Sequence, residues 1–256
     1  MAEVVIVGSV EEGGALAADA IERLVTSNPE AVLGLATGST PLAIWRSLAG
    51  RGLDFSRVRG FALDEYVGLP PGHPESYRAV ITREVVEPLG MTPELVRVPA
   101  DRGPIEEAGA SYERAIIDAG GVDLQVLGIG RTGHIGFNEP GSSLTSLTRV
   151  KTLTEQTRLD NARFFPSVDD VPTHCITQGL GTILRARHLV LLAFGEAKAE
   201  ALAGAVEGPV TASLPGSVIQ LHEHVTVIVD DAAASELQYA DYYRYAWDNR
   251  LEWERV

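Results

Sequence analysis

The sequence predicts an α/β fold with a mostly parallel sheet and helices on both faces. Short apolar runs rich in β-branched residues alternate along the chain with longer segments of helical periodicity. The chain has 256 residues, of which 45% are hydrophobic and 22% charged, which suits a globular protein with a substantial core. No repeat, low-complexity segment or shift in composition divides it, so we expect residues 1–256 to form one domain.

The expected strands are short and mainly apolar, as is typical of strands buried in a parallel sheet. They are residues 4–7, 31–35, 58–63, 95–98, 124–127, 149–153, 189–193 and 225–229. The segments between them show helical spacing; in the first helix Ala15, Leu16, Ile21 and Leu24 form an apolar stripe. The expected helices are residues 11–25, 41–48, 74–85, 105–118, 154–165 (capped by Thr154), 196–206 and 232–250.

The composition excludes several classes of protein. The formal charge is −14, from 35 acidic and 21 basic residues, which argues against binding to nucleic acid or to anionic membranes. Cys175 is the only cysteine, so we expect no disulfide and no thiolate metal cluster, and Cys175 itself reads as a small buried residue. No signal peptide and no apolar run long enough to cross a membrane is present, so we expect a cytoplasmic protein.

The segment Thr37-Gly38-Ser39-Thr40-Pro41 follows an expected strand and precedes an expected helix. Proline suits a first helical turn, and the loop would present free backbone amides and two or three hydroxyl groups at the positive end of the helix. Such an arrangement favours phosphate binding, although an ordinary capped helix start has the same composition. The nucleotide-binding pattern Gly-x-x-x-x-Gly-Lys-Ser/Thr is absent.

Asp64 and Glu65 follow the third expected strand. Two adjacent carboxylates at a strand end suit proton abstraction, but neighbouring strand residues point to opposite faces, so only one of them can face a common site. The sequence does not decide which carboxylate that is, and a solvated turn would also explain the pair.

The most informative segment is the glycine-rich loop from Gly128 to Glu139, which follows the expected strand 124–127. It contains Gly-x-Gly-x-x-Gly, but no amphipathic helix follows, so we reject dinucleotide binding. His134 and Glu139 in this loop make a candidate proton-handling pair.

Basic residues in an acidic protein form a further group of candidates. Arg149, Lys151, Arg158 and Arg163 lie within one segment, and Lys198 opens a helix after a strand. A lysine there could neutralise a phosphate, although each of these residues could equally be a solvated surface charge. No cluster has metal-ligand spacing; His222 and His224 alternate on a strand-like segment and are expected to face solvent, so we expect no metal.

Taken together these motifs resemble the glucosamine-6-phosphate deaminase family, from about Leu33 to Leu237. The resemblance rests on several long segments in the right order. They are Leu-Ala-Thr-Gly-Ser-Thr-Pro, Leu-Asp-Glu-Tyr-Val-Gly-Leu-Pro with His-Pro-Glu-Ser-Tyr, Gly-His-Ile-Gly-Phe-Asn-Glu-Pro, Thr148 to Thr154, Asp160 to Phe165, and Gly204 to Gly208.

The resemblance implies a Rossmann-like fold, no cofactor, and conversion of glucosamine 6-phosphate and water to fructose 6-phosphate and ammonia. It implies that Asp64 is the enolisation base and that His134 and Glu139 open the sugar ring. It also assigns phosphate binding to Gly38, Ser39, Thr40, Arg163 and Lys198, beside Thr37 of the same loop.

The resemblance also bears on the residue beside His134 and on a site for an effector. Many family members carry an aspartate where this chain has Thr132, so we expect Glu139 to be the main carboxylate partner of His134. Regulated members bind N-acetylglucosamine 6-phosphate between subunits, and Ser142, Ser143, Arg149 and Lys151 match parts of that effector site. A monomer and a homo-oligomer are both compatible with the sequence.

Two other functions are alternatives to the deaminase, one as a different enzyme and one as a non-catalytic protein. A 6-phosphogluconolactonase shares the fold and the glycine-histidine loop but would lack the continuation Phe-Asn-Glu-Pro, which is present here. A non-catalytic sugar-phosphate sensor would need a DNA-binding segment, and the chain has neither a helix-turn-helix extension nor a basic face.

Overall fold

The computed structural model describes residues 3–101 and 103–251. A seven-stranded sheet with the order β1-β10-β9-β6-β2-β3-β5 forms its centre, and all of its pairings are parallel. Its strands are β1 (Glu3–Val7), β2 (Val32–Leu35), β3 (Arg59–Ala62), β5 (Val96–Arg97), β6 (Leu124–Gly128), β9 (His188–Ala193) and β10 (Val225–Asp230). This sheet confirms the predicted fold class.

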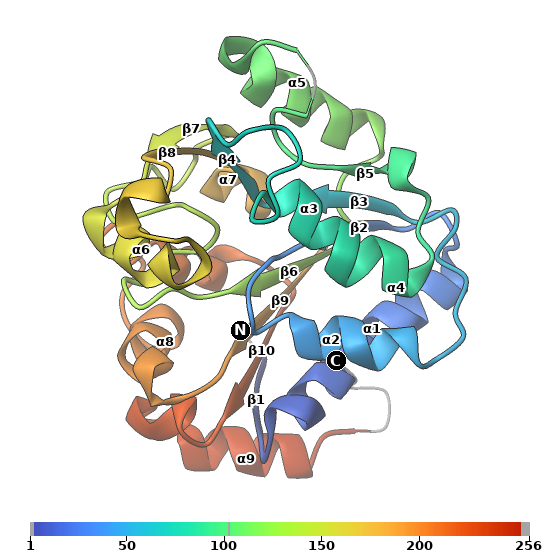
Figure 1. Ribbon diagram of the computed structural model, residues 1–256. Helices are drawn as coiled ribbons and strands as arrows, with labels where there is room; N and C mark the ends of the chain where they lie inside the picture. The colour runs from blue at the N-terminus through green and yellow to red at the C-terminus, as the bar shows by residue number, and fades with distance from the viewer. Residues whose placement is uncertain (1–2, 102, 252–256) are drawn as a thin grey trace.

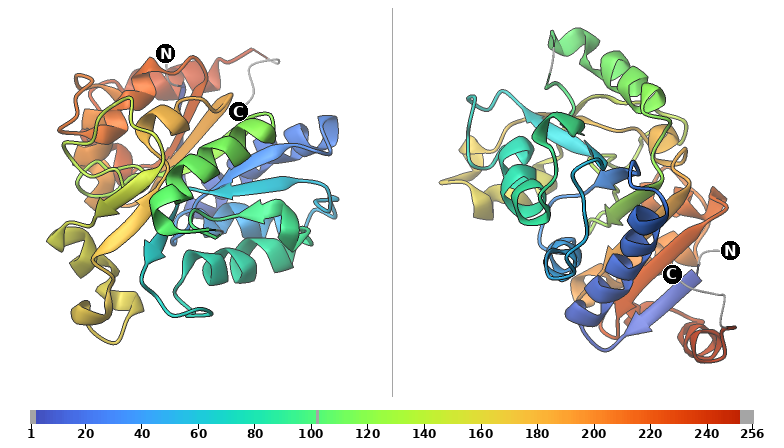
Figure 2. Two further views of the ribbon diagram at one scale, coloured as in Figure 1. Left: turned by 90° about the horizontal axis from the view of Figure 1, so that it is seen from above. Right: turned by 90° about the vertical axis from the view of Figure 1, so that its right-hand side faces the viewer.

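Helices surround this sheet, with α1, α2, α3 and α4 on one side and α8 on the other (Figure 1). Their bounds are α1 (Val10–Ser27), α2 (Leu42–Ala49), α3 (Tyr77–Ile81), α4 (Glu87–Leu89), α5 (Ile105–Asp118), α6 (Glu155–Asn161), α7 (Leu180–Ile183), α8 (Ala199–Val206) and α9 (Ala240–Asp248). A π-helical turn joins α3 to α4, and α9 packs against the edge strand β1 (Figure 2). Apolar side chains of β9 and β10 lie at the centre of the main core.

A second, three-stranded antiparallel sheet was not predicted from the sequence. It has the order β4-β8-β7, from β4 (Asp64–Val67), β8 (His174–Thr177) and β7 (Arg149–Thr152). Only Leu63 separates β3 from β4, so the chain passes directly from one sheet into the other. Residues 64–67 are therefore a strand and not a solvated turn.

A small core lies against this second sheet. It consists of Tyr66, Phe137, Leu153, Phe165, Val171 and Cys175. Cys175 is fully buried, which confirms its interpretation as a small core residue.

The prediction of one continuous helix over residues 232–250 is wrong in the middle of that range. A 3₁₀ turn over Ala233–Glu236 ends before α9 begins at Ala240. The Glu207 carboxylate accepts hydrogen bonds from the backbone N–H groups of Gln238 (2.7 Å) and Tyr239 (3.0 Å). Glu207 is the residue that caps the C-terminus of α8. A tertiary contact therefore stabilises the break between the 3₁₀ turn and α9.

Candidate active site

A cavity of about 670 Å³ lies at the carboxyl ends of β2, β3, β6 and β9. Its walls come from the loops after these strands and from the segment of α6 and the following 3₁₀ turn (Ala162–Phe164). This is the edge of a parallel sheet at which α/β proteins bind their ligands. Of the predicted site residues, those that line the cavity are Thr37, Gly38, Ser39, Thr40, Asp64, His134, Arg163 and Lys198.

Asp64 faces this cavity from the start of β4. Its side chain is 7% exposed and has no hydrogen-bond or ion-pair partner among the described residues. Burial, with a smaller effect from the Glu65 charge, raises the pKa of Asp64 to about 8. Gly136 lies close by, because a Cβ atom there would be 3.5 Å from Asp64 Oδ2. An unpartnered carboxylate with a raised pKa is well suited to accept a proton.

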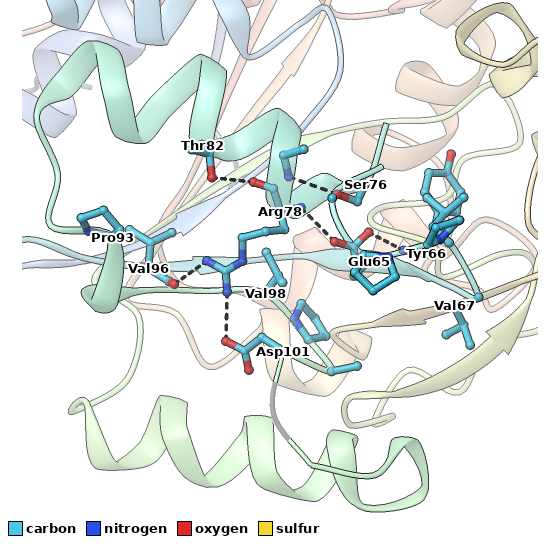
Figure 3. Close-up of a pocket in the computed structure, with 18 of the residues that line it drawn as sticks. Glu65, Tyr66, Val67, Ser76, Arg78, Thr82, Pro93, Val96, Val98 and Asp101 are labelled. Atoms are coloured by element: carbon cyan, nitrogen blue, oxygen red, sulfur yellow. Dashed lines mark hydrogen bonds and ion pairs between the residues drawn. The ribbon is translucent and has the colours of Figure 1, made fainter. Parts of the chain in front are cut away.

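Glu65 points to the opposite face of β4 (Figure 3). Its carboxylate accepts hydrogen bonds from the backbone N–H groups of Tyr66 (2.8 Å), Tyr77 (2.9 Å) and Arg78 (2.8 Å). Burial still leaves its pKa raised, although these three donors lower it. Glu65 therefore stabilises the start of α3, and of the two adjacent carboxylates only Asp64 faces the cavity at the carboxyl edge of the large sheet.

His134 is connected to Glu139 both directly and through Thr132. The imidazole Nδ1 lies 2.9 Å from the Thr132 hydroxyl and 3.4 Å from Glu139 Oε2. The Thr132 hydroxyl donates to Glu139 Oε2 (3.2 Å), so we assign the Nδ1–H of His134 as the donor to the Thr132 oxygen. This arrangement leaves His134 Nε2 for the cavity, while Glu139, which is 3% exposed, lies behind the imidazole.

The second oxygen of Glu139, Oε1, accepts hydrogen bonds from Thr154 (3.3 Å) and Thr157. Burial alone would raise the pKa of Glu139. The hydrogen bond and the charge of His134, with the hydroxyls of Thr157 and Thr132, outweigh burial and lower it. Glu139 is therefore held as a carboxylate next to His134, as expected for a residue that orients and stabilises an imidazolium.

The loop Thr37–Thr40, with its phosphate-binding candidates, also lines this cavity. Pro41 precedes α2 directly, and α2 has no side-chain cap, so the Ser39 and Thr40 hydroxyls do not serve as an ordinary helix cap. Gly38 has a φ of +98°, a left-handed conformation that glycine adopts without strain. The loop therefore keeps the Ser39 and Thr40 hydroxyls and its first amides for a ligand, whereas the Thr37 side chain is hydrogen-bonded to Tyr77.

Lys198 and two arginines, Arg131 and Arg163, line the same cavity and lie close enough for their charges to interact. Burial lowers the pKa of Lys198; Asp160 raises it, and the charges of Arg163 and Arg131 lower it further. No carboxylate lies within ion-pair distance of any of these three cations in the part of the chain that the structure describes. Asp160 lies near enough to act on Lys198, and three like charges that share a cavity with no carboxylate in ion-pair contact among the described residues favour an anionic ligand between them.

The family of glucosamine-6-phosphate isomerases/6-phosphogluconolactonase matches residues 9–228 of this chain. The chain belongs to this family. Two relatives named glucosamine-6-phosphate deaminase come from Bifidobacterium longum strain DJO10A and Rhodococcus jostii strain RHA1. The first is 56% identical over 270 residues and covers 100% of both chains; the second is 60% identical over 257 residues and covers 98% of this chain and 99% of its own.

A solved structure of a monomeric glucosamine-6-phosphate deaminase superposes with a TM-score of 0.88 at 40% identity, over 91% of this chain and 99% of that chain. The 6-phosphogluconolactonase of Trypanosoma brucei has a TM-score of 0.74 at 18% identity, over 93% of this chain and 99% of its own. The lactonase shares the fold, and the deaminases of the family share far more of the sequence.

The residues predicted to match the family's effector site lie outside the cavity. Arg149 donates to Asn138 Oδ1 (2.9 Å), and Lys151 is half-buried on the same strand, β7. Ser143 is exposed, whereas Ser142 is buried with its hydroxyl unpartnered. An effector role for these four residues stays a prediction.

Several residues that line the cavity were missed in the sequence. They are Tyr66, Tyr77, Arg131, Phe137, Thr157, Asn161 and Phe165. Tyr77 stacks on Phe137 with ring centroids 5.9 Å apart, so the aromatic wall of the cavity joins three distant segments. Arg131 could have been found, because it lies inside the glycine-rich loop; the aromatic residues carry no comparable signal in the sequence.

The contacts of the described residues also test the predictions made for Arg158 and His224. Arg158 does not share a face with Arg163; it donates to the carbonyl oxygens of Val168 (2.8 Å) and Val171 (3.0 Å). His224 is exposed, as predicted, and stacks on His188 with centroids 3.6 Å apart. No group of three or more His, Cys, Asp or Glu side chains suited to a metal ion occurs in residues 3–101 and 103–251, and none of their helices could cross a membrane.

Proposed function

We propose that the protein is a glucosamine-6-phosphate deaminase, which converts glucosamine 6-phosphate and water to fructose 6-phosphate and ammonia. The observation that carries the proposal is one cavity that Asp64, unpartnered and with a raised pKa, and His134, backed by Glu139, share with a group of cations. The relatives that are 56% and 60% identical over almost their whole length bear this name, which supports the same reaction here.

Substrate binding follows from the charges that line the cavity. The phosphate accepts hydrogen bonds from the loop Thr37–Thr40 and is neutralised by Arg131, Arg163 and Lys198. Anchoring the phosphate there brings the sugar carbons toward Asp64 and His134 and makes the later steps effectively intramolecular.

Ring opening is the task of His134. Its Nε2 takes the proton of the C1 hydroxyl and returns one to the ring oxygen, which breaks the bond between C1 and that oxygen. Glu139 acts through the imidazole as a positioning residue, because it lies behind His134 and stabilises the transient imidazolium.

Isomerisation is the task of Asp64. Its carboxylate removes the proton from C2 of the open chain, and the proton is then delivered to C1. The C2–N bond becomes an imine, to which water adds before ammonia leaves, so the nitrogen departs with no change in the overall oxidation state. No step of this scheme requires a cofactor.

The proposal covers the reaction and does not extend to regulation, assembly or location in the cell. Activation by N-acetylglucosamine 6-phosphate, the choice between monomer and homo-oligomer, and a cytoplasmic location stay predictions from the sequence. Since the effector candidates lie outside the cavity, catalysis as proposed does not depend on them.

The test is ammonia release from glucosamine 6-phosphate by the purified protein, with and without N-acetylglucosamine 6-phosphate. We expect release by the wild type, at least about a thousandfold loss in Asp64→Asn, and normal release in Asp118→Asn, a matched change of an exposed aspartate on α5. Absence of release under both conditions, with hydrolysis of 6-phosphogluconolactone instead, would replace the proposal with the lactonase alternative.

A further inference from the structure

The short helix α6 is hydrogen-bonded directly to Glu139. Thr157, which is 3% exposed, donates its hydroxyl to Glu139 Oε1, and Thr154 donates to the same oxygen over 3.3 Å. The two threonines are also joined to each other, because the Thr154 hydroxyl lies 3.0 Å from that of Thr157 and accepts the Thr157 backbone N–H over 3.2 Å.

The two oxygens of Glu139 therefore serve different partners. Oε2 is shared by Thr132 and His134, whereas Oε1 is bound only by the hydroxyls of α6 among the described residues. A carboxylate held at both oxygens has little rotational freedom, so the direction in which Oε2 faces the imidazole depends on the hydroxyl at Oε1.

The C-terminal part of the same segment also lines the cavity and carries Arg163, one of the phosphate-binding candidates. Arg163 lies in the 3₁₀ turn that continues α6 without a break, and Asn161 donates to the Tyr66 hydroxyl over 3.0 Å. Only five residues separate Thr157 from Arg163, all of them in helical backbone. One continuous helical element therefore joins Arg163, which lines the cavity, to Thr157.

We propose that Thr157 is a positioning residue that fixes the Glu139 carboxylate behind His134 and links phosphate binding by Arg163 to the ring-opening pair. This inference rests on the proposed deaminase function. It assigns Thr157 no contact with reacting atoms; its effect passes through Glu139.

The first experiment compares Thr157→Val, which keeps the shape and removes the hydroxyl, with Thr157→Ser, which keeps the hydroxyl. For Thr157→Val we expect kcat for ammonia release to fall about tenfold, as for loss of a hydrogen bond to a charged group, with KM changed less than about twofold. We also expect the Glu139 carboxyl group to titrate at higher pH, because loss of the donor makes the carboxylate easier to protonate. Thr157→Ser should restore both.

The control is Thr152→Val, which removes an exposed hydroxyl from β7. An unchanged kcat and an unchanged Glu139 titration in Thr157→Val overturn the positioning role, as does the same loss of kcat in Thr157→Ser, since the hydroxyl would then be irrelevant.

The link to phosphate binding is tested by combining Thr157→Val with Arg163→Ala. If α6 transmits the effect, the double variant loses less kcat than the product of the two single losses. A loss equal to that product overturns the link and leaves Thr157 as a local support of Glu139.

A readout without turnover separates this inference from the proposed function. Carboxyl ¹³C NMR of Glu139, assigned with Glu139→Gln, should titrate at higher pH in Thr157→Val than in the wild type. Absence of ammonia release by the wild type contradicts the deaminase assignment, whereas an unshifted Glu139 titration contradicts the role of Thr157 whichever reaction the cavity performs.

Discussion

The pockets on the two faces of β4 differ in what their charged side chains contact. The pocket behind Glu65 is the larger, at about 1020 Å³, but its principal charges are bound within the chain: Glu65 by three backbone amides and Arg78 by Asp101 at 3.0 Å (Figure 3). The cavity in front of Asp64 holds about 670 Å³, and Asp64, Arg131, Arg163 and Lys198 have no ion-pair partner among the described residues.

The difference teaches that unpaired charge, and not volume, marks the reactive site in this protein. Folding leaves a charged group buried and unpaired only at a cost, because burial disfavours its charged form. In the pocket behind Glu65, the charges of Glu65 and Arg78 are satisfied by the fold itself. The cavity in front of Asp64 keeps its charges for a ligand.

The largest expected effect concerns Asp64 and pH. Since its pKa is raised to about 8, Asp64 must lose a proton near that pH to act as base, so kcat/KM should rise with pH through a limb near pH 8. The measurement is the pH dependence of kcat/KM for glucosamine 6-phosphate. A rate that is flat from pH 6 to pH 9 contradicts the assignment of Asp64 as the base.

The same raised pKa has a consequence for stability. The folded state keeps the Asp64 proton up to about pH 8, whereas the unfolded chain loses it near 3.8, so stability contributed by protonated Asp64 is lost as the pH rises through this window. Asp64→Asn should therefore be more stable than the wild type at pH 9, by at least about 1 kcal/mol given about 1.4 kcal/mol per unit of pKa shift, and gain less at pH 5. Urea unfolding at both pH values measures this difference.

The next effect concerns Glu65, on the opposite face. Glu65→Gln places an amide N–H₂ where the carboxylate accepts backbone donors, so it should lower the free energy of unfolding by about 1–3 kcal/mol. Because Glu65 does not face the reactive cavity, the folded fraction should still release ammonia, in contrast to Asp64→Asn. A stable but inactive Glu65→Gln protein would remove the distinction between the two faces.

The smallest effect compares two arginines. Arg131→Ala should raise KM for glucosamine 6-phosphate severalfold, as for loss of about 1 kcal/mol of phosphate contact, and leave stability unchanged. Arg78→Ala, which removes the contacts with Asp101 and the Val96 carbonyl, should lower the unfolding midpoint and leave KM unchanged. The same pattern in both variants would show that the two pockets do not differ in the way described.

Much of the fold and of the site could be predicted from local sequence. Buried strands such as β9 and β10 are continuous apolar runs, and α5 begins and ends at the predicted residues, Ile105 and Asp118. Loops with chemically distinctive residues, such as Thr37–Thr40, follow these strands, and in a parallel sheet they meet at one edge. The presence of Asp64, His134 and Lys198 in one cavity could thus be anticipated, whereas Arg163 follows α6 and was placed there only by the family resemblance.

The sequence by itself determined the α/β alternation, the edge of the sheet that carries the site, and the residue types placed there, because these depend on local periodicity and strand ends. The residues by themselves left Asp64 and Glu65 open, and apart from the family resemblance only the tertiary structure decided that Asp64 faces the cavity. That choice depends on the pairing of β4 with β8, in which Asp64 lies opposite Thr177, a partner more than a hundred residues away. The contact of Thr157 with Glu139 has the same origin. Alternation along a strand states that neighbours face opposite ways, and only the packing of distant segments states which way is inward.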